Sequence, residues 1–468
     1  MTRENMNQLQ SLLDVCHLPR VFQDTIELAQ RLHVAYVWID ASCIVQNDKE
    51  DINREVSSMG EIYRNSYCNL AAIAATDDPQ AGLFVDRDPL TVSAFTIPIH
   101  RLGYHRTYHG YTKEMFKGVN AYSLQRRGWV FQERLLSPRT VYFGRQLSWE
   151  CSNSIAFEIF LEHASEDRQC LPKGSTIYRL KRLLRGPSSE RERLTERQLQ
   201  RAGWWRLVQK FTHCELTDKN DRLPAIAGLA KQFSEYLEDQ YVAGFWKKTL
   251  VIDLLWVRPW GLDWNWALDT VICERSRECS TIRLLAPSWS WASVDFAYAH
   301  ICKVSHHYHI YAEVQGIDLV SGPTDFGRVT HGTLTISGCL VKSYPMPDKQ
   351  RKAKQIRFDF SRKLGGPVMD IYDISESLWD TKPTNIFHFL LLGSYIDILW
   401  SLGRKLHGLI LEATGRIPHE YRRLGVFTHP TGLDGPDYGP ENTRAREAFP
   451  EFADFDPDNY EKTTITIV

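Results

Sequence analysis

The chain has 468 residues, of which 43 % are hydrophobic and 24 % are charged, and this is the composition of a folded globular protein. Its formal net charge of −1 excludes an overall electrostatic attraction to nucleic acid or to a membrane surface. A chain of this length predicts about two to four domains, each able to bury a core without disulfide bonds.

The ten cysteines include no CxxC pair and no Cys/His cluster at zinc-finger spacing. The N-terminal sequence MTRENMNQLQSLLD lacks the basic and apolar regions of a signal peptide, and no window reaches eighteen uninterrupted apolar residues. These features predict free thiols in a reducing compartment. We therefore expect a cytoplasmic protein with no membrane span, no bound metal and no nucleic-acid partner.

The N-terminal part of the sequence alternates between helical and strand patterns. Residues 18–32 carry apolar side chains at helical spacing, and a continuous apolar run follows from Val34 to Ile39. A second amphipathic helix is expected at 51–63, and the run YCNLAAIAA at 67–75 predicts another buried strand. Strand, helix and strand in this order predict a right-handed parallel crossover and hence an α/β layer.

The middle of the chain predicts a short helix in LQRRGWVFQERLL and a small hairpin in TVYFGRQLSWEC, which alternates on both sides of Gly144. The charged run at 178–201 is interpreted as a solvated linker or helix surface. Two helical segments broken at 219–224 should follow. From about residue 280 the strand-like runs, beginning with PSWSWASVDF and HHYHIYAEVQGI, predict a mixed, sheet-containing region.

Asp40 directly follows the first predicted strand. Ligands of parallel α/β sheets bind outside the carboxyl ends of the strands, which would make Asp40 an acid of a ligand pocket. It could equally cap the turn after it by accepting backbone N–H groups. Glu55, one turn into the next helix, could act as a general base or only interact with the helix dipole. The flanking Arg54 and Arg64 could pair with Glu55 or with a phosphate.

The stretch RRGWVFQER, residues 126–134, concentrates three arginines, one glutamate and one tryptophan. Arg127 and Arg134 could clamp an anion while Trp129 stacks on a ring. The alternative, which we favour at this point, is a buried Arg–Glu pair that docks the helix, with Glu133 as the nearest partner.

For two other clusters we prefer a structural role to a binding role. Trp289 and Trp291 would share one face of a strand and are expected to be core residues rather than a stacking platform. His307 and His309 would share another strand face, but no carboxylate stands at a spacing that completes a metal site. The sequence contains no GxGxxG, Walker A, GxSxG or HExxH motif.

Three blocks of sequence resemble the fungal heterokaryon incompatibility (HET) domain proteins. They are LPRVFQDTIELAQRL, then YVWIDASCIVQND with the following EVSSMGEIYRNSYCNLAAIAA, and RRGWVFQERLLSPRTVYFGRQLSWEC. Farther on, DRLPAIAGLAKQF, YVAGFWKKTL and APSWSWASVD resemble the region that often accompanies this domain. The likeness covers most of residues 18 to 295.

The resemblance implies a HET domain at 1–165 and a helical and β-containing C-terminal region at 166–468. It also implies a remote likeness to Toll/interleukin-1 receptor (TIR) domains, with their flavodoxin-like parallel α/β sheet. Family members carry an earlier strand with a Ser-Tyr-x-Trp-Gly-like sequence, and this chain begins after its expected position. The resemblance therefore implies a sheet that lacks its first strand and exposes an edge and apolar surface.

Some TIR domains cleave the nicotinamide–ribose bond of NAD with a glutamate on a helix. By resemblance, Glu55 is the corresponding candidate catalytic residue, with Asp40 lining the pocket. NAD would be a substrate, and no permanently bound cofactor is expected. The candidate binding residues are Cys43, Tyr63, Arg64, Arg127, Trp129, Glu133 and Arg134.

Three functional hypotheses follow. The first is an intracellular effector of self/non-self recognition or defence cell death, acting by NAD hydrolysis on self-association. The second is a non-enzymatic interaction module that signals through a protein partner. The third is a HET-type scaffold of secondary metabolism whose aromatic-lined cavity, at Trp129 and Trp289, binds an apolar metabolite.

Overall fold

The computed structural model describes ten stretches of the chain, apart from gaps of one or two residues, and a few short pieces between them. The ten stretches are residues 1–75, 81–87, 95–110, 122–158, 203–257, 286–294, 308–343, 386–396, 404–431 and 461–468. The chain divides into two compact units, Met1–Leu237 and Glu238–Val468. The boundary expected near residue 165 and most of the charged run at 178–201 lie outside the described residues.

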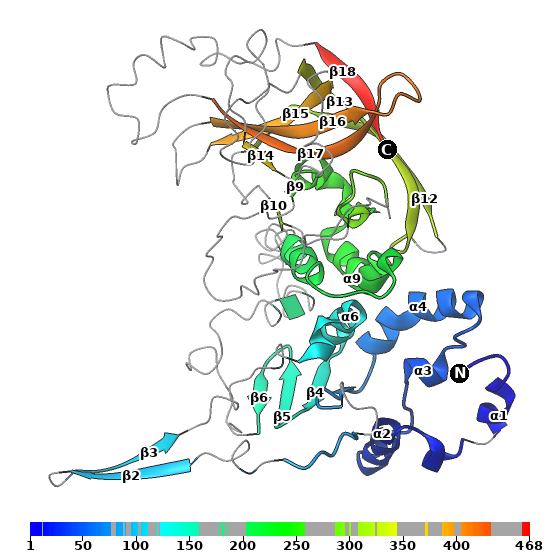
Figure 1. The fold of residues 1–468 in the computed structure, drawn as a ribbon, viewed down its shortest axis with the longest axis vertical. Coiled ribbons are helices and arrows are strands. Elements are labelled where there is room, and N and C mark those ends of the chain that lie inside the picture. The colour runs from blue at the N-terminus through cyan, green and yellow to red at the C-terminus, as the bar shows by residue number, and fades with distance from the viewer. Residues whose placement is uncertain are drawn as a thin grey trace, which may run out of the picture. The chain divides into compact units, whose positions relative to one another are not determined.

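The first unit begins with helices (Figure 1). The two long helices expected from periodicity are present, and α4 begins where Asp48 accepts hydrogen bonds from the backbone N–H groups of Glu50 and Asp51. Glu50 and Asp51 in its first turn and Arg64 in its last turn both suit the helix dipole. The helices are α1 (Met6–Ser11), α2 (Arg20–Arg31), α3 (Asp40–Cys43) and α4 (Lys49–Arg64), with a 3-10 turn at Val15–His17.

The strand expected at Val34–Ile39 is wrong. These residues pair with no strand in the described part of the chain, and Tyr36 is 91 % exposed. Ile39 has extended backbone angles, so the local conformation suits a strand but the ladder is missing. A strand is stabilised by hydrogen bonds to its neighbours, and an apolar run alone does not supply them.

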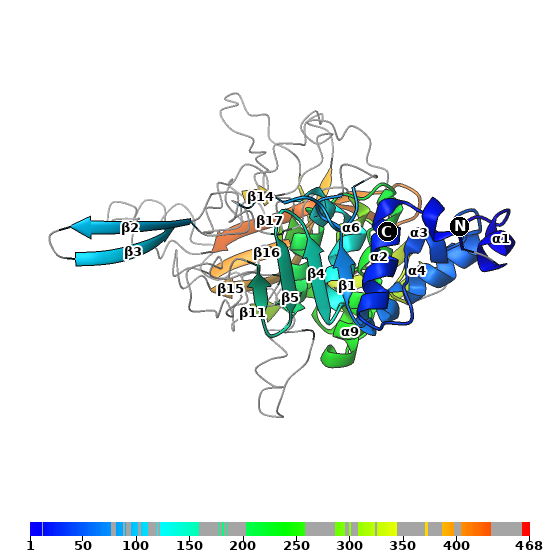
Figure 2. The same ribbon diagram turned by 90° about the horizontal axis from the view of Figure 1, so that it is seen from below.

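A four-stranded sheet in the order β1-β4-β5-β6 follows the helices, and Figure 2 shows β1, β4 and β5 side by side. The predicted buried strand at 67–75 is present only as β1 (Asn69–Ala71), which pairs parallel to β4 (Arg139–Phe143). The predicted hairpin is confirmed, because β4 runs antiparallel to β5 (Leu147–Cys151), which in turn pairs with β6 (Ile155–Phe157).

The sheet is therefore mixed rather than the parallel, flavodoxin-like sheet that we expected. Two features explain the difference. The three-residue loop between β4 and β5 is long enough only for an antiparallel turn. No strand forms at 34–39 to begin the parallel crossover. Of the predicted fold class, the structure confirms the mixed α/β architecture.

Helix α6 (Gly128–Leu136) forms where the short helix was expected, and a 3-10 turn at Ser123–Arg126 precedes it. The two helical segments expected farther on are confirmed as residues 203–211 and α9 (Ala227–Leu237). Short 3-10 turns at Lys219–Asp221 and Pro224–Ile226 lie between them.

Helices α4 and α9 cross at two glycines. A Cβ atom on Gly60 would lie 2.8 Å from the Cα atom of Gly228, and the reverse contact would be 2.7 Å. The side chain of Gln132 on α6 accepts a hydrogen bond from the backbone N–H of Gly228 at 2.8 Å. The crossing thus brings the ends of α4 and α9 against α6, where the candidate site residues lie.

A separate hairpin of two strands, β2 (Phe95–Arg101) and β3 (Tyr104–Gly110), also belongs to the first unit (Figure 1). In the described part of the chain these strands pair only with each other. Ile97, Ile99 and Tyr108 on this hairpin are exposed.

The second unit buries a cluster of tryptophans: Trp246, Trp256, Trp289 and Trp291. The prediction that PSWSWASVD forms a strand is wrong, because Ser290 caps a 3-10 turn by accepting the backbone N–H of Ala292 at 3.1 Å. The short elements around the cluster are β7 (Tyr241–Val242), β8 (Phe245–Trp246), a 3-10 turn at Lys247–Thr249, α10 (Leu250–Asp253), β9 (Trp256–Val257), a 3-10 turn at Trp291–Ser293 and β10 (Ala299–His300).

The larger sheet of the second unit confirms the sheet-containing C-terminal region. Pairings of β13 with β15, β15 with β16, β16 with β17, β17 with β18 and β18 with β13 close a ring of strands. Phe389, Ile410 and Phe427 are among the residues of its apolar core. The strands are β11 (Tyr308–Ile310), β12 (Glu313–Ser321), β13 (Val329–Ser343), β14 (Asp370–Tyr372), β15 (Phe387–Ile396), β16 (Arg404–Ala413), β17 (Glu420–Thr431) and β18 (Lys462–Ile467).

The crossing at Gly60 gives a prediction for stability. Gly60→Ala should lower the free energy of unfolding by about 1–3 kcal/mol, because the new methyl group meets the backbone of Gly228 rather than a movable side chain. Ser57→Ala, at an exposed position of the same helix, is the control and should change stability little. Urea unfolding of both variants measures the difference. An equal effect of the two substitutions would contradict the close crossing.

Candidate functional site

The candidate residues come from three helices of the first unit. Asp40 begins α3, Tyr63 lies in the last turn of α4, and Arg127 and Glu133 lie before and within α6. Glu133 accepts a hydrogen bond from the side chain of Tyr63, and both interact electrostatically with Asp40 and Arg127. Four of the nine residues suggested by the sequence thus form one group, which we call the Glu133 cluster.

The Glu133 carboxyl has an unusual protonation equilibrium. Burial raises its pKa to about 7, and the negative charge of Asp40 acts in the same direction. The hydrogen bond from Tyr63 and the positive charge of Arg127 oppose this rise. The net result is a carboxyl that exchanges a proton near neutral pH, as general acids and bases of enzymes do.

Tyr63 is held in place as a donor to this carboxyl. Burial raises the pKa of the Tyr63 hydroxyl, and the negative charge of Glu133 raises it further. Its ring also makes an edge contact with Trp38, with 5.7 Å between the ring centroids. Tyr63 therefore stays protonated beside Glu133.

Asp40 is the first residue of α3, and Ile39 is the N-cap of this helix, without a side-chain cap hydrogen bond. The Oδ1 atom of Asp40 accepts a hydrogen bond from the backbone N–H of Ala41 at 2.7 Å, in the first turn of α3. The side chain is also exposed and close enough to Glu133 to raise the pKa of that carboxyl. Asp40 therefore contacts the backbone of α3 locally and takes part in the cluster.

Glu55 lies apart from the Glu133 cluster along α4. Eight residues separate it from Tyr63, which corresponds to about 12 Å of helix rise. Its Oε1 atom lies 3.5 Å from Nε of Arg54, and Arg54 also pairs with Asp51. Asp51 in turn accepts the backbone N–H of Val45 at 2.8 Å, so this group secures the loop between α3 and α4.

The remaining candidates have individual surroundings. Nη2 of Arg64 lies 3.5 Å from Oε2 of Glu235 on the surface of α9. Trp129 donates its indole N–H to Oδ2 of Asp221 at 3.2 Å, and Cys43 is partly buried at the end of α3. The structure does not bring these three side chains together with the Glu133 cluster through any of these contacts.

Arg134 is buried in an ion pair, but its partner is Glu150 of β5 rather than the adjacent Glu133. Nε and Nη2 of Arg134 donate to Oε2 of Glu150 at 3.0 and 2.5 Å. Tyr142 donates to the same carboxylate at 3.3 Å, and Nζ of Lys181 lies 3.6 Å from its other oxygen. Nη1 of Arg134 also donates to Gln125 at 3.2 Å. We call these five residues the Arg134 network.

The Arg134 network explains how two buried cations and one carboxylate are tolerated. The positive charge of Arg134 lowers the pKa of Glu150 against the effect of burial. Burial lowers the pKa of Lys181, whose Nζ also donates to the backbone carbonyl of Arg134 at 3.0 Å. Sequence reasoning missed Glu150, although a carboxylate at an inward position of the alternating run QLSWEC was the signal for a buried ion pair.

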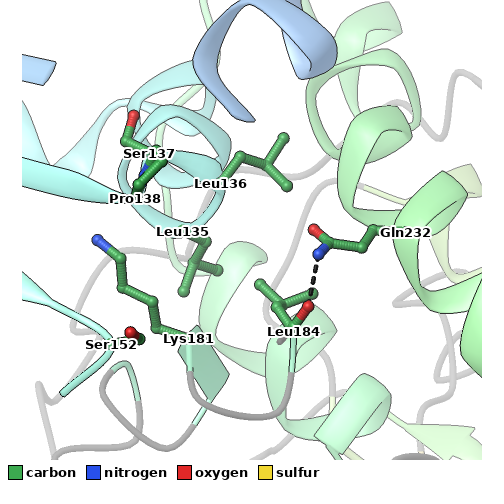
Figure 3. Close-up of a pocket in the computed structure, with 8 residues that line it drawn as sticks. All are labelled: Leu135, Leu136, Ser137, Pro138, Ser152, Lys181, Leu184 and Gln232. Carbon is green, nitrogen blue, oxygen red and sulfur yellow. Dashed lines mark hydrogen bonds between the residues drawn. The ribbon is translucent and has the colours of Figure 1, made fainter. Parts of the chain in front are cut away.

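A small cavity lies beside the Arg134 network, between α6 and α9 (Figure 3). Its volume of about 50 Å³ is far below the several hundred Å³ that enclose a drug-sized ligand. Gln232 closes one side by donating to the carbonyl of Leu184. The lining residues are Leu135, Leu136, Ser137, Pro138, Ser152, Lys181, Leu184 and Gln232. This space can hold a water molecule but no nucleotide.

Within the described ranges, no three His, Cys, Asp or Glu side chains are grouped so that they could hold a metal ion. His309 is exposed on β11, and His307 lies outside the described residues. Trp289 is fully buried in the second unit.

Residues 2–133 match the family described as heterokaryon incompatibility protein (HET). This N-terminal part of the chain is therefore similar to a HET domain. The matched segment contains all four residues of the Glu133 cluster, and it indicates a function related to heterokaryon incompatibility. No curated protein matches the chain. No solved structure matches it either. Among the described helices, none combines the length and the apolar character needed to cross a membrane.

The Arg134 network gives a prediction for the stability of the first unit. Arg134→Met should lower the free energy of unfolding by about 3–5 kcal/mol, because Glu150 would stay buried with only the more distant Lys181 as a cationic partner. Arg64→Met removes an exposed ion pair with Glu235 and should cost less than about 1 kcal/mol. Denaturant unfolding separates the two. Similar losses would refute a special role for the buried pair.

The Glu133 carboxyl gives a prediction for pH dependence. Its folded-state pKa of about 7 lies above the value of about 4.3 in an unfolded chain, so the folded state binds this proton more tightly. The resulting stabilisation is complete below about pH 4 and is lost as the pH rises through about 7. Glu133→Gln imitates the protonated form and should raise the free energy of unfolding at pH 8 by on the order of 2 kcal/mol.

Urea unfolding between pH 5 and pH 8 measures this effect. The control is Glu61→Gln, because a hydrogen bond from Lys231 lowers the pKa of Glu61 and reverses the sign of its contribution. A pH dependence of stability that is unchanged by Glu133→Gln would show that this carboxyl titrates normally.

Proposed function

We propose that this chain is a cytoplasmic effector of fungal self/non-self recognition and that the Glu133 cluster is the working site of its HET domain. One observation carries the proposal. The segment that matches the HET family contains Asp40, Tyr63, Arg127 and Glu133, and these residues, far apart in sequence, interact with one another in the fold.

The cluster has the chemical groups needed to cleave an N-glycosidic bond of a nucleotide. Arg127 can bind a phosphate, since its guanidinium is exposed and always charged. The carboxylates of Asp40 and Glu133 can accept hydrogen bonds from ribose hydroxyls and stabilise the positive charge that develops on the sugar. We therefore propose NAD as the substrate.

In this reaction the bond between ribose C1′ and the nicotinamide nitrogen breaks, and its electron pair leaves with nicotinamide. Water adds to C1′ and releases a proton, which the deprotonated Glu133 carboxylate accepts before passing it to solvent. The products are nicotinamide, ADP-ribose and a proton. A carboxyl with a pKa of about 7 suits this role at neutral pH.

NAD turnover by the full-length protein tests the proposal. Glu133→Gln and Asp40→Asn should each lower the turnover by about 100-fold or more, as expected for loss of a general base or a charge-stabilising group. Glu61→Gln, a carboxyl outside the cluster, should leave turnover unchanged. Glu55→Ala decides between a site at Glu55 on α4 and one at Glu133 on α6, because a larger loss of turnover there than at Glu133 would move the site toward Glu55.

The second hypothesis, a non-enzymatic interaction module, also has an observation in its favour. The first unit exposes several large apolar side chains, among them Leu32, Tyr36 and Tyr67. Exposed apolar side chains of this size serve protein–protein contacts when they are contiguous. Absence of NAD turnover at every protein concentration, together with retained cell-death activity of Glu133→Gln and Glu55→Ala in fungal cells, would favour this hypothesis over the enzyme.

A further inference from the structure

Backbone hydrogen bonds hold both ends of the segment Val34–Ile39. Between these ends, the segment pairs with no strand in the described part of the chain. The backbone N–H of Val34 donates to the carbonyl of Ala29 at 2.9 Å, and the carbonyl of Ile39 accepts the N–H of Ser42 at 2.9 Å. Among the backbone hydrogen bonds of the described chain, none involves residues 35–38. Their N–H and C=O groups are therefore available to a strand from outside.

The side chains of this segment are also of the types that are common in strands paired with a neighbouring strand. Tyr36 is 91 % exposed and Val37 is 36 % exposed. Aromatic and β-branched residues are the types enriched in paired strands. An exposed extended segment of such residues is a template for pairing with another chain unless charge or proline protects it, and residues 34–39 contain neither.

We propose that the segments Val34–Ile39 of two copies of this chain pair as antiparallel strands centred on Tyr36 and form a symmetric dimer. The charges at the ends of the segment favour this occupant. The entering end carries the exposed Arg31 and His33, although Arg31 also pairs with Glu27, and the leaving end carries the exposed Asp40. Antiparallel pairing places the basic end of one copy beside the acidic end of the other. Parallel pairing would place the two basic ends together and the two acidic ends together.

Two-fold symmetry makes this dimer testable at one position. In a symmetric antiparallel pair centred on Tyr36, Val34 pairs with Trp38 and Ala35 with Val37, and the two-fold axis passes between the two copies of Tyr36. Tyr36 then faces its own counterpart. A charge introduced at position 36 therefore meets the same charge from the other copy close to the axis.

Sedimentation velocity of the full chain between about 1 and 100 µM tests the proposal. Wild type should shift from monomer to dimer across this range, which corresponds to a micromolar Kd. Tyr36→Asp and Tyr36→Lys should each raise the Kd by at least about tenfold, because like charges face each other across the axis. An equimolar mixture of these two variants should restore the dimer, since opposite charges then meet.

The mixture excludes misfolding as the cause of a lost dimer, because two misfolded variants would not rescue each other. Ile97→Asp on the β2–β3 hairpin is the matched control, since it also places a charge at an exposed apolar position of the same unit. A monomeric wild type at 100 µM would overturn the proposal. So would a dimer that Tyr36→Asp leaves intact, or one that Ile97→Asp disrupts equally. The measurement reads oligomeric state only and is independent of NAD turnover.

Discussion

The ion pair between Arg134 and Glu150 is the constraint around which the first unit is arranged. It joins helix α6 to strand β5 in a buried setting, where neither charge is tolerated without the other. Because Arg134 faces the sheet, the adjacent Glu133 is directed to another side of the same helix, where Tyr63 and Asp40 lie. The structural pair and the candidate reactive carboxyl are thus neighbours in sequence with opposite roles. One requires a fixed charge, and the other exchanges a proton.

The neighbours of Glu150 and Glu133 separate these roles. Glu150 has two cations near it, and its pKa is lowered despite full burial. Glu133 has one hydrogen-bond donor, one cation and one nearby carboxylate, and its pKa is raised to about 7. The difference lies in the balance of neighbouring charges rather than in the amount of burial. Such contrasts between buried carboxyl groups are a physical criterion for a functional site.

Local sequence patterns predicted the helices α4 and α6 and the β4–β5 hairpin, because spacing of apolar residues and turn chemistry act within a few residues. The strand at 34–39 failed since an apolar run does not reveal whether a partner strand is present. The Trp289–Trp291 strand failed because Ser290 captures a backbone N–H and bends the chain. Likewise, the sequence suggested Asp40, Tyr63, Arg127 and Glu133 separately, but only the fold shows that they interact, while Glu150 was overlooked altogether.

The closed ring of strands in the second unit has a consequence for synthesis on the ribosome. Strand β18 pairs with both β13 and β17, and more than a hundred residues separate it from β13. The ring cannot close until residues 462–467 have left the exit tunnel, and until then β13 and β17 each present an open edge. Nascent chains therefore pass through a long, aggregation-prone stage in which chaperones have the greatest opportunity to bind. A messenger RNA truncated before codon 462 would encode a protein in which the edges of β13 and β17 stay open permanently.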